Sequence, residues 1–153
     1  MKIPFFIIIL SILVFSNEAT ILDDCEKGNS KSCREVGDIF KYDLGELYLS
    51  IKYYDLGCKY GDAISCKNSG SGFLFLGSKE KGLSDFKKSC ELNHYPSCAL
   101  LGSLYLQGEI VKPNIKYGYL YLLKACNKGK MDDACNVVAA IEKDLLRSKK
   151  LKK

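Results

Sequence analysis

The sequence predicts an all-α protein, an α/α solenoid of helix pairs. Three observations lead to this prediction. Cysteine pairs recur at intervals of 32 to 36 residues, helix-ending residues follow the first cysteine of each pair, and apolar residues at helical spacing follow the second. A period in this range is typical of stacked helical units, and 153 residues suit one such domain. The pairs are Cys25/Cys33, Cys58/Cys66, Cys90/Cys98 and Cys126/Cys135.

Residues that favour helix ends and close helix contacts recur in phase with the cysteines. Glycine or asparagine stands three positions after each first cysteine, and both types accept the left-handed conformation that ends a helix. We therefore expect each first cysteine in the last turn of one helix and each second cysteine in the first turn of the next. Small residues four positions after each second cysteine should let paired helices approach closely. The two sets are Gly28, Gly61, Asn93 and Gly129, and Gly37, Gly70, Gly102 and Ala139.

Aromatic residues follow each second cysteine by seven positions, two helical turns, in the first three copies. They are Phe40, Phe73 and Tyr105, and Glu142 replaces them in the last copy. An apolar stripe of this kind predicts core filling between helices.

The third copy shows the complete unit most clearly. Apolar residues at helical spacing begin at Cys98, Gly108 ends that helix, and a second apolar pattern runs from Asn114 to Cys126. From second cysteine to next first cysteine the copies span 25, 24 and 28 residues, so the first two are shorter in the loop or in the second helix. The candidate N-caps are Asn29 or Ser30, Asp62, Asn114, and Asp132 or Asp133.

This unit resembles the Sel1-like repeat, a relative of the tetratricopeptide repeat, over residues 25–135. The resemblance is carried by Cys98-x3-Gly102-x2-Tyr105-x2-Gly108, by Val111-x2-Asn114 and by Tyr121-x3-Ala125-Cys126. With a cysteine pair in each repeat, it more closely resembles the Helicobacter cysteine-rich protein family. Each pair is then expected to form a disulfide across the turn between consecutive helices. The expected bridges are Cys25–Cys33, Cys58–Cys66, Cys90–Cys98 and Cys126–Cys135, the last with a slightly different turn.

The N-terminal residues predict export. Residues 1–19 have a positive start at Lys2 and an apolar stretch of about 13 residues, which suits a signal peptide and is short for a membrane span. Cleavage after Ser16 or after Ala19 is compatible with the small residues there, and an uncleaved anchor is the alternative. An even number of cysteines in an exported chain favours disulfides, so we expect a secreted or periplasmic protein with no membrane span after cleavage.

The predicted organisation is a signal peptide at 1–19, a repeat solenoid of about three full units plus end caps at 20–146, and a basic tail at 147–153. The tail contains five basic residues, so the net charge of +5 leaves a balanced body and gives no indication of nucleic-acid binding. We expect the tail to be a solvated, frayed chain end, with contact to anionic lipid or cell-wall polymer as the alternative.

Catalytic residues cannot be assigned from the sequence. His94 is the only histidine, and the Ser-x-x-Lys matches at Ser78/Lys81 and Ser84/Lys87 are as many as the serine and lysine content gives by chance. If all eight cysteines pair, no thiolate is left as a nucleophile. We expect no metal and no cofactor, and whether the protein is an enzyme stays open.

Two functions therefore compete. The resemblance implies penicillin binding and weak β-lactamase activity, and a β-lactamase as the main activity is the alternative. The solenoid itself predicts a scaffold that binds a peptide, a cell-wall fragment or a host protein, and β-lactams if they share its groove. Its expected contacts follow each second cysteine by one or five positions, away from the cysteine face. They are Arg34, Asp38, Lys67, Ser71 and Ser103.

Overall fold

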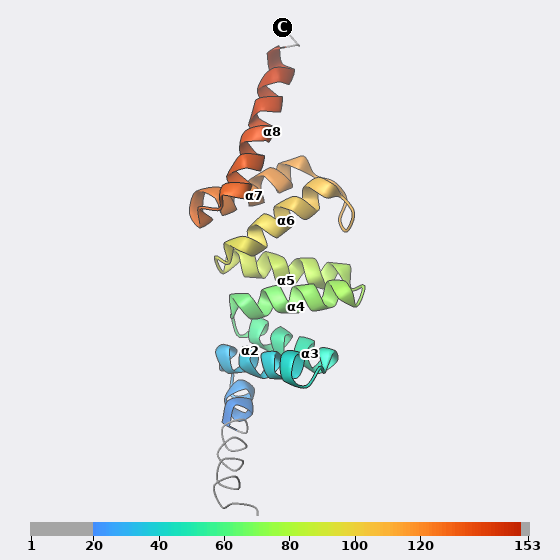
Figure 1. Ribbon diagram of the computed structural model, residues 1–153, viewed down its shortest axis with the longest axis vertical. Coiled ribbons are helices and arrows are strands. Elements are labelled where there is room, and N and C mark those ends of the chain that lie inside the picture. The colour runs from blue at the N-terminus through green and yellow to red at the C-terminus, as the bar shows by residue number, and fades with distance from the viewer. Residues whose placement is uncertain (1–19, 151–153) are drawn as a thin grey trace, which may run out of the picture. The chain divides into compact units, whose positions relative to one another are not determined.

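The computed structural model describes residues 20–150, in which helices are joined by short turns and no strand occurs (Figure 1). The all-α prediction is confirmed. Residues 20–26 are helical, and the predicted signal peptide lies outside the described residues. The labelled elements are α2 (Ser30–Asp38), the π-helix η1 (Ile39–Asp43), α3 (Leu47–Lys59), α4 (Ala63–Phe75), α5 (Lys79–Glu91), α6 (Tyr95–Gln107), α7 (Ile115–Gly129) and α8 (Asp132–Lys150).

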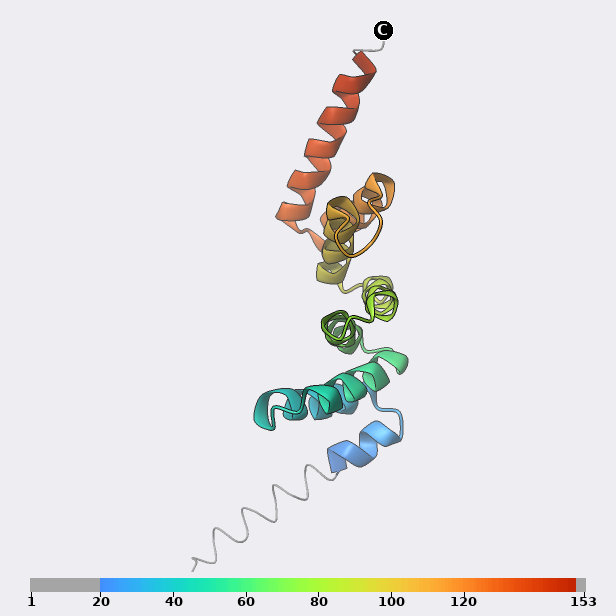
Figure 2. The same ribbon diagram turned by 90° about the vertical axis from the view of Figure 1, so that its right-hand side faces the viewer.

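Within residues 20–150 the chain forms two compact units, which divide between Ser69 and Gly70 inside α4. In the first unit α2 packs against α3, and Cys25, Cys33 and Val36 form a buried cluster. In the second unit α6 packs against α5 and α7, and α8 packs on α7 (Figures 1 and 2). Apolar burial from successive helices thus builds each unit, as the repeat predicts.

The four expected disulfides join the end of one helix to the start of the next. Their Cα–Cα distances are 4.5, 4.3, 4.8 and 4.7 Å in chain order. The cysteines of the first three bridges are at most 2% exposed, whereas Cys126 and Cys135 are half-buried. The predicted solenoid with disulfide-closed turns is confirmed.

Three of the four predicted helix ends have the expected backbone. Gly28, Gly61 and Asn93 are left-handed, with φ of 98°, 93° and 65°. The prediction for Gly129 is wrong, because α7 continues through it and Lys130 is left-handed instead, at φ 54°. A Cβ on Gly129 would lie 2.4 Å from the Cβ of Tyr95, so this glycine is small to admit a neighbouring side chain.

Capping side chains fix the helix starts. Asn29, and not Ser30, caps α2 by accepting from two backbone N–H groups, and Asn114 accepts from Tyr117 N to cap α7. Asp62 accepts from Ser65 N at 2.6 Å. The prediction that Asp132 or Asp133 precedes the last helix is wrong. Both lie inside the first turn of α8, where a carboxylate interacts favourably with the positive end of the helix dipole.

The first-helix glycines permit the close approach that was predicted. A Cβ on Gly37 would lie 2.7 Å from the ring of Tyr54, and one on Gly102 would lie 2.5 Å from Leu122 Cγ. Gly70 likewise faces Phe86, at 3.2 Å. Each partner stands four positions before the next first cysteine, so the same contact recurs in the three helix pairs.

The loops account for the unequal repeat lengths. Each second helix begins eleven positions before its cysteine, at Leu47, Lys79 and Ile115. The connection before it is 44–46, 76–78 or 108–114, so the third repeat has the longer loop. The first repeat is one residue longer than the second. This additional residue lies in the first helix and coincides with the π-helix η1, which is the usual result of inserting one residue into an α-helix.

The last helix runs past the predicted boundary of the basic tail. α8 continues to Lys150, and its second half extends beyond α7 (Figure 2), with Leu145 and Leu146 exposed. Glu142, which replaces the aromatic residue in the last copy, is exposed and accepts from the hydroxyl of Tyr119 at 2.8 Å.

Candidate functional site

Three of the predicted ligand contacts lie in the first unit, and we call Arg34, Asp38 and Lys67 the polar row. All three are half-buried. A guanidinium nitrogen of Arg34 lies 3.6 Å from Asp62 Oδ2, and Asp38 accepts from the hydroxyl of Tyr54 at 2.6 Å. Their positions are therefore fixed by partners within the protein.

Tyr54 holds this part of the first unit together. The residue is 2% exposed, and its hydroxyl also hydrogen-bonds with the side chain of Asn68, to which Lys67 Nζ donates at 3.2 Å. Burial raises the pKa of Tyr54, and the bond to Asp38 raises it further. One buried phenol thus links α2, α3 and the start of α4.

Replacing Tyr54 by phenylalanine removes the donor to a half-buried carboxylate, so we expect the free energy of unfolding to fall by about 1–2 kcal/mol.

The pH dependence of the free energy of unfolding should change as well. Folding raises the pKa of Tyr54 above its unfolded value of about 10, so this stabilisation is complete below about pH 10 and is lost as the pH rises further. Urea unfolding between neutral and alkaline pH should show a steeper loss for the natural protein than for Tyr54→Phe. Tyr48→Phe, at a ring 73% exposed, should follow the natural protein; equal slopes for Tyr54→Phe would contradict this account.

The other two predicted contacts lie in the second unit. Ser71 is exposed on α4, and Ser103 is half-buried on α6. The structure therefore brings together the first-unit members of the predicted set, and the two serines belong to a different compact unit.

The predicted aromatic residues form ring pairs between the paired helices. Phe40 stacks on Tyr53 with ring centroids 5.3 Å apart, and Tyr105 stacks on Tyr121 at 5.9 Å. All are half-buried and pack against the edge of the cores. In both repeats the tyrosine of the second helix stands five positions before the next first cysteine.

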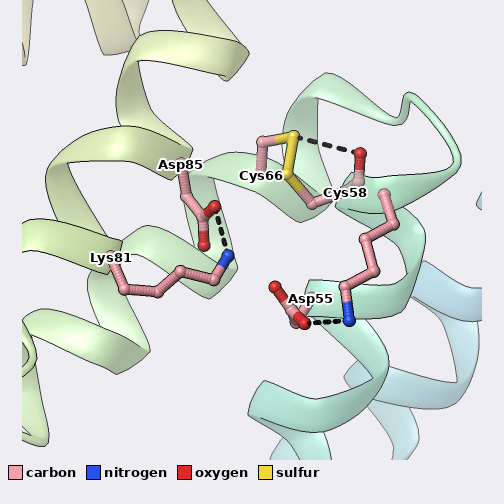
Figure 3. A network of polar contacts seen from close by, with 6 residues as sticks. Asp55, Cys58, Cys66, Lys81 and Asp85 are labelled. Carbon is pink, nitrogen blue, oxygen red and sulfur yellow. Dashed lines mark hydrogen bonds and ion pairs between the residues drawn. A yellow bond between two sulfur atoms is a disulfide. The ribbon is translucent and has the colours of Figure 1, made fainter.

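The second repeat replaces this ring pair by an ion pair, which sequence reasoning missed. Asp85 occupies the tyrosine position, is 4% exposed, and accepts from Lys81 Nζ at 2.5 Å (Figure 3). The ammonium lies 5.0 Å from the ring centroid of Phe73, the aromatic residue of this repeat. Aligning the second helices on their cysteines would have revealed an aspartate where the other two repeats have tyrosine.

Neither Ser-x-x-Lys match has the geometry of a nucleophile with its base. Ser78 and Lys81 line a surface pocket of about 420 Å³, but Lys81 donates to Asp85 and so does not present a lone pair to the serine. In the other match Ser84 is exposed, and Lys87 lies 3.9 Å from Glu91.

His94 has a serine partner that the sequence did not indicate. Its Nδ1 lies 2.9 Å from Ser97 Oγ, which is 2.8 Å from Ser89 Oγ. Both serines are at most 1% exposed, so a substrate could not reach them without a local opening of the fold. The contact joins two side chains at the start of α6 and does not cap a backbone N–H group.

Between residues 20 and 150 no helix is long and apolar enough to cross a membrane. The same part of the chain has no cluster of three or more His, Cys, Asp or Glu side chains that could hold a metal ion.

Two solved structures with a similar fold are repeat proteins. A Sel1 repeat protein from Oxalobacter formigenes has a TM-score of 0.67 at 13% identity, over 80% of this chain and 96% of that one. A protective antigen present in uropathogenic Escherichia coli strains, displaying an SLR fold, has a TM-score of 0.67 at 24% identity. That match covers 81% of this chain and 28% of the antigen. No family model matches the sequence, and no curated protein does.

Proposed function

We propose, starting from the Sel1-like repeat fold that this chain has, that it is an exported scaffold for peptide-like or cell-wall-derived ligands. Paired-helix repeats present extended surfaces for recognition. Four disulfides fit an oxidising compartment, secreted or periplasmic. The proposed partner is a peptide, a cell-wall fragment or a host protein.

The observation that supports this proposal most is the preorganised polar row. Arg34 and Asp38 stand one turn apart on α2, and each is held by a partner on another segment. An extended peptide offers alternating donors and acceptors, which a guanidinium and a carboxylate complement. Side chains that are already fixed lose little entropy on binding.

Efficient β-lactam hydrolysis has weaker support. Lys81 is paired with Asp85, and the serine beside His94 is buried. Catalysis of this kind usually needs an accessible nucleophile within reach of an oriented base. A β-lactam resembles a D-alanyl peptide, so binding with slow hydrolysis is compatible with the proposed scaffold.

The test uses oxidised protein beginning at Thr20, titrated with peptidoglycan peptides and with a chromogenic β-lactam. We expect saturable peptide binding that Arg34→Ala and Asp38→Asn weaken and that Lys31→Ala, at an exposed position of α2, leaves unchanged. For the lactam we expect kcat/KM below about 10⁴ M⁻¹s⁻¹. A higher value that is abolished by replacing Ser78, Ser84 or His94 would overturn the proposal in favour of an enzyme.

A further inference from the structure

The third repeat presents a group of tyrosines on α6 and α7, which we call the tyrosine cluster: Tyr105, Tyr117 and Tyr121. The rings of Tyr105 and Tyr121 are nearly parallel, at 7°, and Tyr117 is tilted by 53° with its centroid 5.5 Å from that of Tyr105. Tyr117 is 51% exposed, so aromatic surface faces the solvent here.

The second repeat shows what this place in the fold can hold. Counted from the cysteines, Phe73 corresponds to Tyr105, and Lys81 and Asp85 correspond to Tyr117 and Tyr121. There an ammonium lies 5.0 Å from the aromatic ring, beside a carboxylate that balances its charge. In the third repeat tyrosine replaces both of these charged residues.

Glu91 follows Cys90, which belongs to the buried core cluster against which Tyr105 and Tyr121 pack. In keeping with this placement, burial raises the pKa of Tyr121, and the charges of Tyr105 and Glu91 raise it further. Glu91 is itself exposed, and its ion pair with Lys87 is long, at 3.9 Å, between two exposed side chains. Such a pair is easily exchanged for another cation.

We propose that the tyrosine cluster and Glu91 form a docking surface for a lysine or arginine side chain of a basic partner peptide. Electron-rich ring faces attract a cation, and an adjacent carboxylate supplies the complementary charge. The surface belongs to the second unit and shares no residue with the polar row, so the inference does not depend on the function proposed for that row.

The probe is the peptide acetyl-Gly-Lys-Arg-Gly-amide, compared with an analogue that carries norleucine and citrulline in place of lysine and arginine. With tyrosine-labelled protein, NMR should show saturable shifts of the cluster ring resonances for the basic peptide only. Tyr117→Leu should weaken binding about fivefold and Glu91→Gln about twofold. The matched control, Tyr48→Leu at an exposed ring of the first unit, should leave the affinity unchanged.

A second variant tests the comparison between repeats. The double change Tyr117→Lys with Tyr121→Asp recreates the internal ion pair of the second repeat, so it should abolish the peptide-dependent shift of Tyr105. Arg34→Ala should not affect this binding, which separates the outcome from that of the proposed function. Equal affinity for the neutral analogue, or no effect of Tyr117→Leu in a variant whose helical circular dichroism is unchanged, would overturn the inference.

Discussion

Reduction of all four disulfides is expected to unfold the protein at about 37 °C. Each bridge closes a sequence separation of 8 or 9 residues. On the chain-entropy model a loop this short contributes about 2.5 kcal/mol, so four bridges contribute on the order of 10 kcal/mol. That is comparable to the whole stability of an ordinary domain.

The bridges should not be reduced together. Cys126–Cys135 is half-buried, whereas the other three are at most 2% exposed, so a reductant reaches the fourth bridge without local unfolding. Titration with dithiothreitol, followed by alkylation and peptide mapping, should find Cys126 and Cys135 modified first, while helical circular dichroism persists. Full helicity after alkylation of all eight cysteines would contradict the energetic estimate. Reduction of a buried bridge before Cys126–Cys135 would contradict the predicted order of reduction.

Replacing Lys81 by methionine is expected to destabilise the second unit by about 3 kcal/mol, because it removes the Lys81 ammonium from the buried carboxylate of Asp85. The figure is at the low end for a buried pair, since the lysine side chain is 41% exposed and water can reach that end. The loss of the ammonium above Phe73 adds to this cost in the same direction. Urea denaturation of the natural and variant proteins measures it.

The matched variant replaces both partners. Lys81→Tyr with Asp85→Tyr installs the residues that the third repeat has at these positions, so the ring pair should recover most of the lost stability. The control is Lys31→Ala, at an exposed position of α2 in the first unit, which should change the free energy of unfolding by less than about 0.5 kcal/mol. If Lys81→Met proves as stable as the natural protein, the ion pair is not a structural element of the second repeat.

Local patterns were enough to predict the helical fold and the disulfide partners. The cysteine period identifies stacked units, and the glycine or asparagine after each of the first three first cysteines ends a helix through its own backbone freedom. Asn29 and Asn114 could be recognised as caps because a cap bonds to N–H groups two or three residues away. Features of this kind depend on neighbours in the chain, which the sequence displays directly.

The candidate sites were less predictable, because they depend on side chains that meet across helices. Arg34 and Asp38 could be predicted as candidate contacts from their positions after Cys33. The contacts with Asp62 and Tyr54 that fix their side chains could not be predicted. The sequence also offered no reason to pair His94 with a buried serine.

What the sequence by itself determined is therefore the repeat: where the helices before the first three bridges end, which cysteines pair, and which glycines face a second helix. The tertiary structure decided how each position is used. Gly129 is small because Tyr95 packs against it, and not because the chain turns there. Asp85 and Tyr121 occupy equivalent positions, yet one holds an internal ammonium and the other stacks on a ring. The physical reason is that a helix end is a short-range property of the backbone, whereas burial, charge pairing and ring stacking depend on which side chain the opposite helix supplies.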